Sequence, residues 1–298
     1  MIVLCSIPAI ALWIGIRLMP ESSRWYVAKD RLYEAIGALK RVRNEAVDGL
    51  LVEELADIAT IHRAETSSER KGFGYVWRTP WLRKLMIVDI FPGTTNQLTG
   101  VNTVMYYASK VLQYAGMDTS SAIGAQVANG VMSVVGSALG IWPTLKFRRR
   151  PILIADVIGV GLSLLTIAAV FQFAIAPYMN AQQTPPAWAA YAVLGLMAVF
   201  MLIVQPSNGT IVWTMMGELF PNNVRGVMNG TAIFCLWIVN AIVGWTFPVM
   251  IEGLGGGLTY TIYGIVNLVV AVVLFRVMPE TSGKSLEEIE TEMEKRFS

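Results

Sequence analysis

The sequence has very little histidine and cysteine, which excludes several kinds of chemistry at once. Its 298 residues include one histidine, His62, and two cysteines, Cys5 and Cys235. The cysteines lie in separate apolar stretches, so they predict neither a disulfide framework nor a metal site, and we expect no cofactor. A single histidine excludes catalytic schemes that need several histidines. We therefore expect a protein that is not an enzyme.

Charged residues are also scarce, at 15% of the chain, while hydrophobic residues make up 54%. The formal net charge of +2 comes from gaps between apolar runs, so it does not indicate nucleic-acid binding. Most of the runs reach the ~20 residues that cross ~30 Å of hydrocarbon, which predicts an all-α polytopic membrane protein. The seven runs are approximately residues 1–18, 85–115, 120–146, 151–177, 187–219, 227–251 and 258–278.

Basic residues are missing from every second gap between the runs. Gaps 116–119, 178–186 and 252–257 contain no Lys or Arg, and of the 23 basic residues only Lys110 lies near them. Loops rich in Lys and Arg stay in the cytoplasm. We therefore expect a multi-pass protein of the plasma (inner) membrane, with the long gap 19–84 and the C-terminus in the cytoplasm and the N-terminus outside.

The long gap 19–84 has an internal pattern. Apolar residues recur at helical spacing over 32–42 and again over 51–61. This pattern predicts two or three amphipathic helices on the cytoplasmic face of the membrane. The alternative is a solvated, charged linker.

Five short segments of the sequence resemble the motifs of a known protein family. They resemble, in the same order, the sugar porter motifs PESPRWL, QQLTGIN…YY, GRRP, SEIFP…RG and PETKGKSLEE. The chain is thus similar to the C-terminal half of the sugar porters, a family of the major facilitator superfamily. The segments are Pro20–Tyr26 (PESSRWY), Asn96–Tyr107 (NQLTGVNTVMYY), Arg149–Pro151 (RRP), Gly217–Gly226 (GELFPNNVRG) and Pro279–Glu288 (PETSGKSLEE).

The resemblance implies the C-terminal six-helix bundle of a major facilitator fold, preceded by the end of the sixth span and a linker. We expect the end of span 6 at 1–19 and a cytoplasmic linker with short amphipathic helices at 20–80. Spans 7–12 would form the bundle at 81–278, and 279–298 would be a cytoplasmic tail. The N-terminal six-span half would be a missing partner.

Polar side chains gather near the middle of the run 85–115, where they are costly unless they pair or line a wet cavity. Gly100 among them allows the helix to break, as transporter helices do at midplane sites. Amides suit vicinal hydroxyls, and an indole face covers the apolar side of a sugar ring. For each single side chain, the alternative is interhelical packing or hydrogen bonding. The expected substrate-binding residues, which the resemblance also indicates, are Asn96, Gln97, Asn102, Asn129, Trp213, Trp237 and Asn240.

The resemblance also implies two gates. Tyr106 and Tyr107 fall on the extracellular-gate segment. At the cytoplasmic ends of the spans, charged residues of alternating sign would form salt bridges that close the inward gate. The alternative is ordinary flanking charge that determines topology. The expected cytoplasmic-gate residues are Glu21, Arg24, Arg149, Arg150, Glu218, Arg225 and Glu280.

These features predict the C-terminal half of a secondary transporter that moves a neutral sugar or polyol, of the hexose or inositol class, by alternating access. We expect proton symport in the intact protein, although the family also includes facilitators. The alternatives are a seven-span receptor or channel, and a truncated half-transporter that is inactive alone. The expected partners are the sugar or polyol, the lipid bilayer and the N-terminal half.

Overall fold

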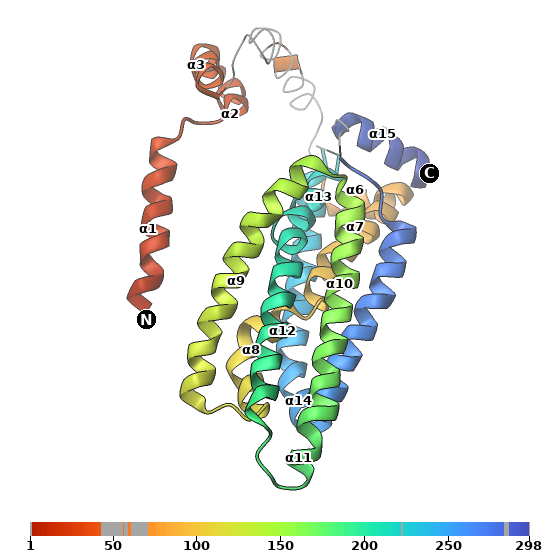
Figure 1. The fold of residues 1–298 in the computed structure, drawn as a ribbon. Helices are drawn as coiled ribbons and strands as arrows, with labels where there is room; N and C mark the ends of the chain where they lie inside the picture. Colours follow the sequence, from red (N-terminus) through yellow and green to blue (C-terminus); the bar gives the residue numbers. More distant parts are fainter. Residues whose placement is uncertain are drawn as a thin grey trace. The chain divides into compact units, whose positions relative to one another are not determined.

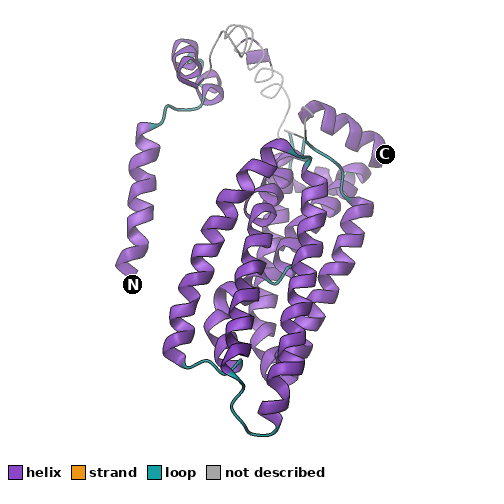
Figure 2. Ribbon diagram, viewed as in Figure 1, coloured by secondary structure: helices purple, strands orange, loops and turns teal. Residues whose placement is uncertain are grey.

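The computed structural model describes residues 2–42, 56, 59–60, 71–221, 223–282 and 286–297. Within these residues every regular element is a helix (Figure 2). This confirms the all-α fold class expected from the apolar runs. The chain divides into two compact units, Met1–Arg70 and Lys71–Ser298.

The first unit contains a small helical hairpin. Buried Ala35 and Leu39 of its second helix pack against Val27 of the first. The second helix covers the same residues as the apolar repeat over 32–42, whereas most of the repeat over 51–61 lies outside the described residues. The helices of this unit are α1 (Ile2–Leu18), α2 (Ser23–Ala28) and α3 (Leu32–Val42).

The second unit is a bundle of apolar helices (Figure 1). Among the described residues, Thr119–Lys146, Arg149–Asn180, Ala187–Glu218 and Arg225–Val277 are long and apolar enough to cross a membrane. The elements are α6 (Phe73–Arg78), α7 (Pro80–Leu98), α8 (Val101–Tyr114), α9 (Thr119–Lys146), α10 (Arg149–Val170), η1 (Phe171–Ile175), α11 (Ala176–Asn180), α12 (Ala187–Pro206), η2 (Ser207–Ile211), α13 (Val212–Glu218), α14 (Arg225–Val277) and α15 (Leu286–Phe297).

α14 contains two of the expected spans, which meet at Gly255. This residue has φ 76° and ψ 165°, outside the helical region, and glycine adopts such a positive φ without steric cost. The rings of Phe247 and Tyr260, on either side of the break, have centroids 5.9 Å apart. A straight helix would separate these residues by about 20 Å. The chain therefore reverses here, and the two apolar halves of α14 lie side by side (Figure 1).

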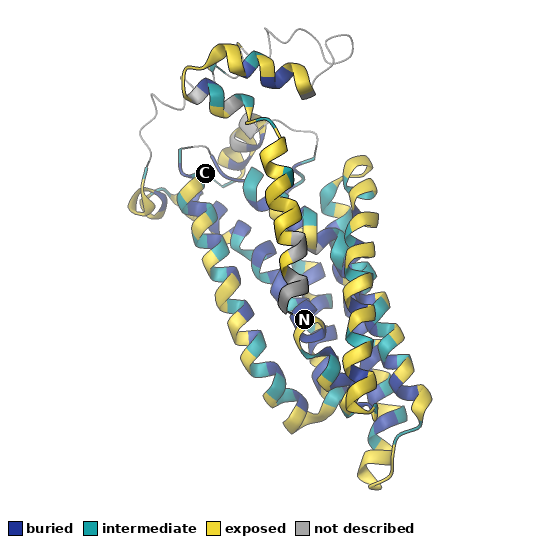
Figure 3. Ribbon diagram, turned by 90° about the vertical axis from the view of Figure 1, so that its left-hand side faces the viewer, coloured by how far each residue is buried: buried dark blue, intermediate teal, exposed yellow. Residues whose placement is uncertain are grey.

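Each long helix buries one side in the bundle and leaves large apolar side chains exposed on the other (Figure 3). The buried side chains form two clusters, one around Phe200 and Tyr260 and the other around Met215 and Leu274. On the outside, Trp245 is 80% exposed. An apolar exterior of this kind suits hydrocarbon, because lipid chains solvate it.

Glycines bring α9 and α12 into close contact. A Cβ atom added to Gly140 of α9 would lie 2.5 Å from the Cα of Pro206, and one at Gly136 would lie 3.1 Å from the carbonyl oxygen of Met201. Small residues at such crossings let two backbones approach closely, which is how membrane helices gain packing energy. This contact holds α9, and with it Asn129, against the bundle.

Replacing Gly140 with alanine is expected to lower the free energy of unfolding by about 1–3 kcal/mol, since the new methyl group meets backbone that cannot rotate away. Denaturation of the detergent-solubilised chain, followed by circular dichroism, measures this loss. The control is Gly130→Ala on the same helix, where the Cβ would meet open space. It should be neutral or stabilising by up to about 1 kcal/mol. An equal loss in both variants would contradict the close contact.

Candidate functional site

The candidate site is built around a helix break between α7 and α8. Gly100 has φ 79°, a left-handed conformation that glycine tolerates. Two hydroxyls bind backbone carbonyls on either side of it: Thr99 donates to Asn96 at 2.6 Å, and Thr103 donates to Gly100 at 2.7 Å. The Thr99 hydroxyl thus binds the carbonyl of Asn96 in the last turn of α7. The carbonyl of Gly100 also accepts from the backbone N–H of Thr103 in the first turn of α8. Pro92, by contrast, lies inside α7 without ending it.

Asn267 of α14 also supports the break and was missed in the sequence. Its side-chain amide donates to the carbonyls of Leu98 at 3.2 Å and Tyr263 at 2.8 Å. One side chain thus joins the end of α7 to the second half of α14. The available signal was a single asparagine inside the apolar run 258–278.

The break brings three of the expected substrate-binding amides together. Gln97 Nε2 donates to Asn96 Oδ1 at 3.1 Å, and Asn102 Nδ2 donates to Gln97 Oε1 at 2.5 Å. All three side chains are buried. Gln97 therefore lies at the centre of a chain of amides that can exchange partners with ligand hydroxyls.

The other expected substrate-binding residues lie on neighbouring helices. Asn129 of α9 and Asn240 of α14 are buried. Within the described part of the chain, both amide atoms of Asn129 are without a hydrogen-bond partner, so they are available to a ligand or water. Trp213 of α13 and Trp237 of α14 are 42% and 55% exposed, which leaves part of each indole face accessible.

The two adjacent tyrosines of α8 have different environments. The hydroxyl of Tyr107 donates to the carbonyl of Gly244 at 2.8 Å, and its ring contacts Phe247 with centroids 5.3 Å apart. Tyr106 is 56% exposed. Tyr107 thus anchors α8 to α14, while Tyr106 faces outward.

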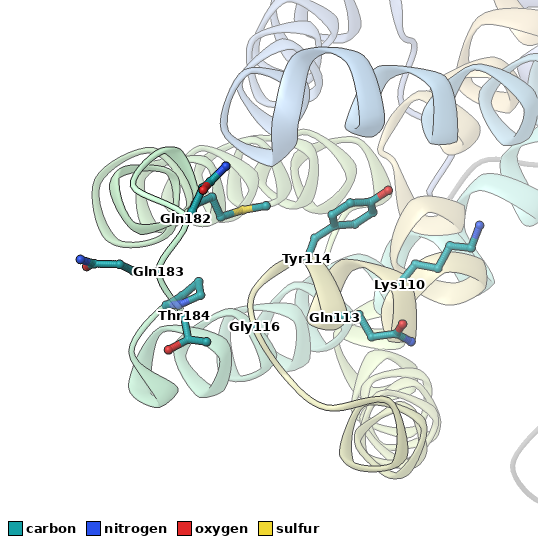
Figure 4. A pocket seen from close by; sticks show the side chains of 9 residues that line it. Lys110, Gln113, Tyr114, Gly116, Gln182, Gln183 and Thr184 are labelled. Atoms are coloured by element: carbon teal, nitrogen blue, oxygen red, sulfur yellow. The ribbon is translucent and has the colours of Figure 1, made fainter.

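A polar cavity of about 570 Å³ lies at the end of the bundle that contains the gaps without basic residues. Figure 4 shows Lys110, Gln113 and Tyr114 on α8 and Gln182 and Thr184 on the loop before α12. The side chains that line it carry ammonium, amide and hydroxyl groups. We refer to this end of the bundle as the polar end.

Asp118 holds the start of α9 at the polar end. Its carboxylate accepts hydrogen bonds from the backbone N–H of Ser121 at 2.9 Å and from the hydroxyl of Ser120 at 2.8 Å. These hydrogen bonds, with Ser121 contributing most, lower the pKa of Asp118 to about 2. The carboxylate therefore remains charged at physiological pH and stabilises the N-terminus of the helix that carries Asn129.

The opposite end, which we call the charged end, carries five of the expected gate residues. Here Arg149, at the start of α10, forms an ion pair with Glu218, at the end of α13. The guanidinium of Arg149 also donates to the hydroxyl of Thr281 at 3.3 Å. Arg225 donates through Nε to the carbonyl of Phe220 at 3.1 Å. The charged side chains therefore connect several helix ends.

Glu280 has a role that differs from a side-chain salt bridge. Its carboxylate accepts from the backbone N–H groups of Arg149 at 3.2 Å and Arg150 at 3.3 Å, and from that of Ser282 at 3.0 Å. A carboxylate at a helix N-terminus satisfies backbone donors and interacts favourably with the helix dipole. Glu280 thus caps α10 from a position 130 residues further along the chain. In return, the guanidinium of Arg150 binds the carbonyl of Phe275 near the end of α14.

The remaining two gate candidates belong to the first unit. Glu21 is exposed there, and the side chain of Arg24 lies outside the described part of the structure. Their proposed role in a salt-bridge network stays a prediction.

Among the residues that the structure describes, two acidic side chains are buried inside the bundle. Asp89 of α7 is fully buried, and both of its carboxylate oxygens are without a hydrogen-bond partner within the described residues. Asp156 of α10 is buried next to Ser207 of η2. Acidic groups at such depth are rare in membrane proteins, where they often mark functional positions.

Comparison with known proteins identifies the family. The sequence model described as "Sugar (and other) transporter" matches residues 1–293. The chain belongs to this family. It is therefore a multi-pass membrane protein of the sugar porters, within the major facilitator superfamily, and not an enzyme. This also argues against a seven-span receptor or channel.

Relatives of this family match almost the whole chain. It is 35% identical over 97% of its length to the putative metabolite transport protein YfiG of Bacillus subtilis, and covers 57% of that protein. It is 36% identical, over the same share, to the major myo-inositol transporter IolT of B. subtilis, and covers 59% of it. The chain thus spans less than two thirds of the length of these relatives.

A solved structure of the same superfamily shares the fold. The proton:xylose symporter XylE bound to 6-bromo-6-deoxy-D-glucose matches 96% of this chain with a TM-score of 0.72 and 25% sequence identity. The match covers 57% of the XylE chain. The helical bundle described above is therefore an arrangement known from this superfamily.

Proposed function

We propose that this chain forms the C-terminal half of a secondary transporter that moves a neutral sugar or polyol by alternating access. The observation that carries the proposal is the buried chain of amides Asn96, Gln97 and Asn102 at the Gly100 helix break. A broken helix that presents polar groups inside a membrane bundle is the usual construction of a transporter site. Amides that can both donate and accept match the hydroxyls of a sugar or polyol.

Accessible indole faces and further amides complete the proposed site. Asn129 and Asn240 add donors and acceptors, and Trp213 and Trp237 provide flat apolar faces for the C–H side of a sugar ring. The relatives favour this ligand class, because one is described as a myo-inositol transporter and the XylE structure contains a deoxyglucose derivative. We assign inositol or a hexose as the substrate class and proton symport as the transport mode.

The proposed orientation follows from the charge asymmetry of the two ends. The charged end, the linker and the C-terminal tail would lie in the cytoplasm, and the polar end outside the inner membrane, because Lys and Arg are retained on the cytoplasmic side. The ion pair between Arg149 and Glu218 would help to close the cytoplasmic gate. Tyr106 would contribute to the outer gate.

A complementation experiment tests this proposal. The chain is expressed alone and together with the N-terminal six-span half of IolT, in cells that lack their own inositol uptake, and accumulation of labelled inositol and glucose is measured. We expect uptake only when the two halves are present together, because the two halves of this fold enclose the substrate between them. Uptake by the chain alone would contradict the assignment as one half. The absence of uptake by the pair, when both halves are found in the membrane, would contradict the transport function.

A further inference from the structure

A second cavity, of about 410 Å³, lies at the charged end between α10 and the last turns of α14. Its walls are apolar: Ile154, Ala155 and Ile158 come from α10, and Phe275 comes from α14. One end of this cavity is basic, because Arg148 and Arg150 line it. We call it the α10–α14 groove.

At the basic end of the groove, the guanidinium groups of Arg148 and Arg150 are not paired with a carboxylate side chain among the described residues. Arg148 is exposed and, among the described residues, takes part in no hydrogen bond or ion pair. Arg150 places its guanidinium 5.5 Å from the centre of the Phe275 ring and donates to the carbonyl of Phe275, a neutral partner. The carboxylate of Glu280 also borders the groove, but it accepts from the backbone of α10.

The dimensions of the groove match a lipid. From Arg150 to Ile158 the helix rises about 12 Å, which is comparable to the upper half of an acyl chain. The walls are part of the outer surface of a membrane protein, since Ile158 is 39% exposed and Phe275 is 64% exposed. The groove therefore extends from the level of lipid headgroups into the hydrocarbon region.

We infer that the α10–α14 groove binds an anionic phospholipid, with the phosphate at Arg148 and Arg150 and one acyl chain along Ile154, Ala155 and Ile158. Guanidinium groups bind phosphate oxygens with short, charge-assisted hydrogen bonds. Basic pockets between membrane helices bind anionic headgroups in this way. The walls formed by Ile154, Ala155 and Ile158 offer no hydrogen-bonding side chains, so they suit an acyl chain better than a sugar. The lipid would hold the start of α10 to the end of α14, next to the Arg149–Glu218 ion pair.

Native mass spectrometry of the full chain in detergent tests this inference. The protein is titrated with dioleoyl-phosphatidylglycerol and, separately, with dioleoyl-phosphatidylcholine, which has the same acyl chains and no net charge. We expect phosphatidylglycerol to bind more tightly, and Arg148→Gln to weaken its binding about five-fold. The matched control is Lys146→Gln, which removes a neighbouring positive charge that stacks on Trp142 and lies outside the groove.

A second pair of variants tests the position of the acyl chain. Ala155→Trp fills the groove and should remove bound phosphatidylglycerol, while Leu162→Trp, at an exposed position further along α10, should leave it bound. Equal binding of the two lipids, or equal losses in Arg148→Gln and Lys146→Gln, would overturn the site. Displacement of the lipid by millimolar inorganic phosphate would indicate a simple anion site and would also overturn it.

Discussion

Uptake by a transporter that carries Gln97→Ala is expected to need about 10- to 100-fold more sugar or polyol for half-maximal rate, because leaving buried polar groups unsatisfied costs ~1–3 kcal/mol. Gln97 connects Asn96 and Asn102. Its removal leaves both of these amides without their shared partner. The site then loses one ligand-binding amide directly and the orientation of two others.

The measurement is the KM for labelled inositol or glucose in vesicles that contain the chain together with an N-terminal half. Gln113→Ala is the matched control, because Gln113 is an exposed glutamine of α8 at the polar end and lies outside the amide cluster. It should leave the KM close to that of the unmodified protein. An unchanged KM in Gln97→Ala, at normal membrane levels, would show that the amide cluster does not bind the substrate.

The Arg149→Ala variant is expected to lower the free energy of unfolding by about 1.5–3 kcal/mol, the range for a hydrogen bond to a charged group. The side chains of Arg149 and Glu218 are only 20% and 25% exposed, so water screens their interaction weakly. Removal of Arg149 leaves the mostly buried carboxylate of Glu218 without its cation. The backbone cap by Glu280 remains, because it binds the N–H group and not the side chain.

A double-mutant cycle separates the ion pair from other effects of truncation. The double variant Arg149→Ala, Glu218→Ala should be no less stable than Arg149→Ala alone, since it also removes the stranded carboxylate. The adjacent Arg148→Ala serves as the control and should change the unfolding free energy little, because Arg148 is exposed. Losses in the double variant that equal the sum of the two single variants would show that the pair is not coupled. Each variant is unfolded in detergent by titration with sodium dodecyl sulfate.

Much of the helical layout could be predicted from local sequence. Apolar runs of sufficient length became the long helices, and the bare gap 252–257 became the reversal at Gly255. Gly100 was expected to permit a break, and the helix does end there. Pro92, by contrast, lies inside α7 and does not end the helix. Helix breaks depend on whether neighbouring groups can satisfy the freed carbonyls, which the local sequence does not show.

The sequence predicted which residues form the candidate site, but it did not predict the hydrogen bonds between them. Asn96, Gln97 and Asn102 were expected in one span, and their spacing of one and five residues allowed contact once the helix broke. Asn267 was missed because it lies in a different span, 169 residues after Leu98, whose carbonyl it binds. Glu280 was expected in a salt bridge, and the structure shows its carboxylate bound to the backbone of α10.

The sequence by itself determined that this is an all-α membrane protein of the sugar porter family, with charged and polar ends. These properties are local, because the length of an apolar run and the position of a charge can be read in a single segment. Only the tertiary structure decided which side chains form hydrogen bonds with the free backbone N–H and C=O groups at the breaks and ends of the helices. Asn267 supports the α7–α8 break, Glu280 caps α10, and Arg148 and Arg150 border an apolar groove. Such partners are distant in the chain, and packing of the helices brings them within hydrogen-bonding distance.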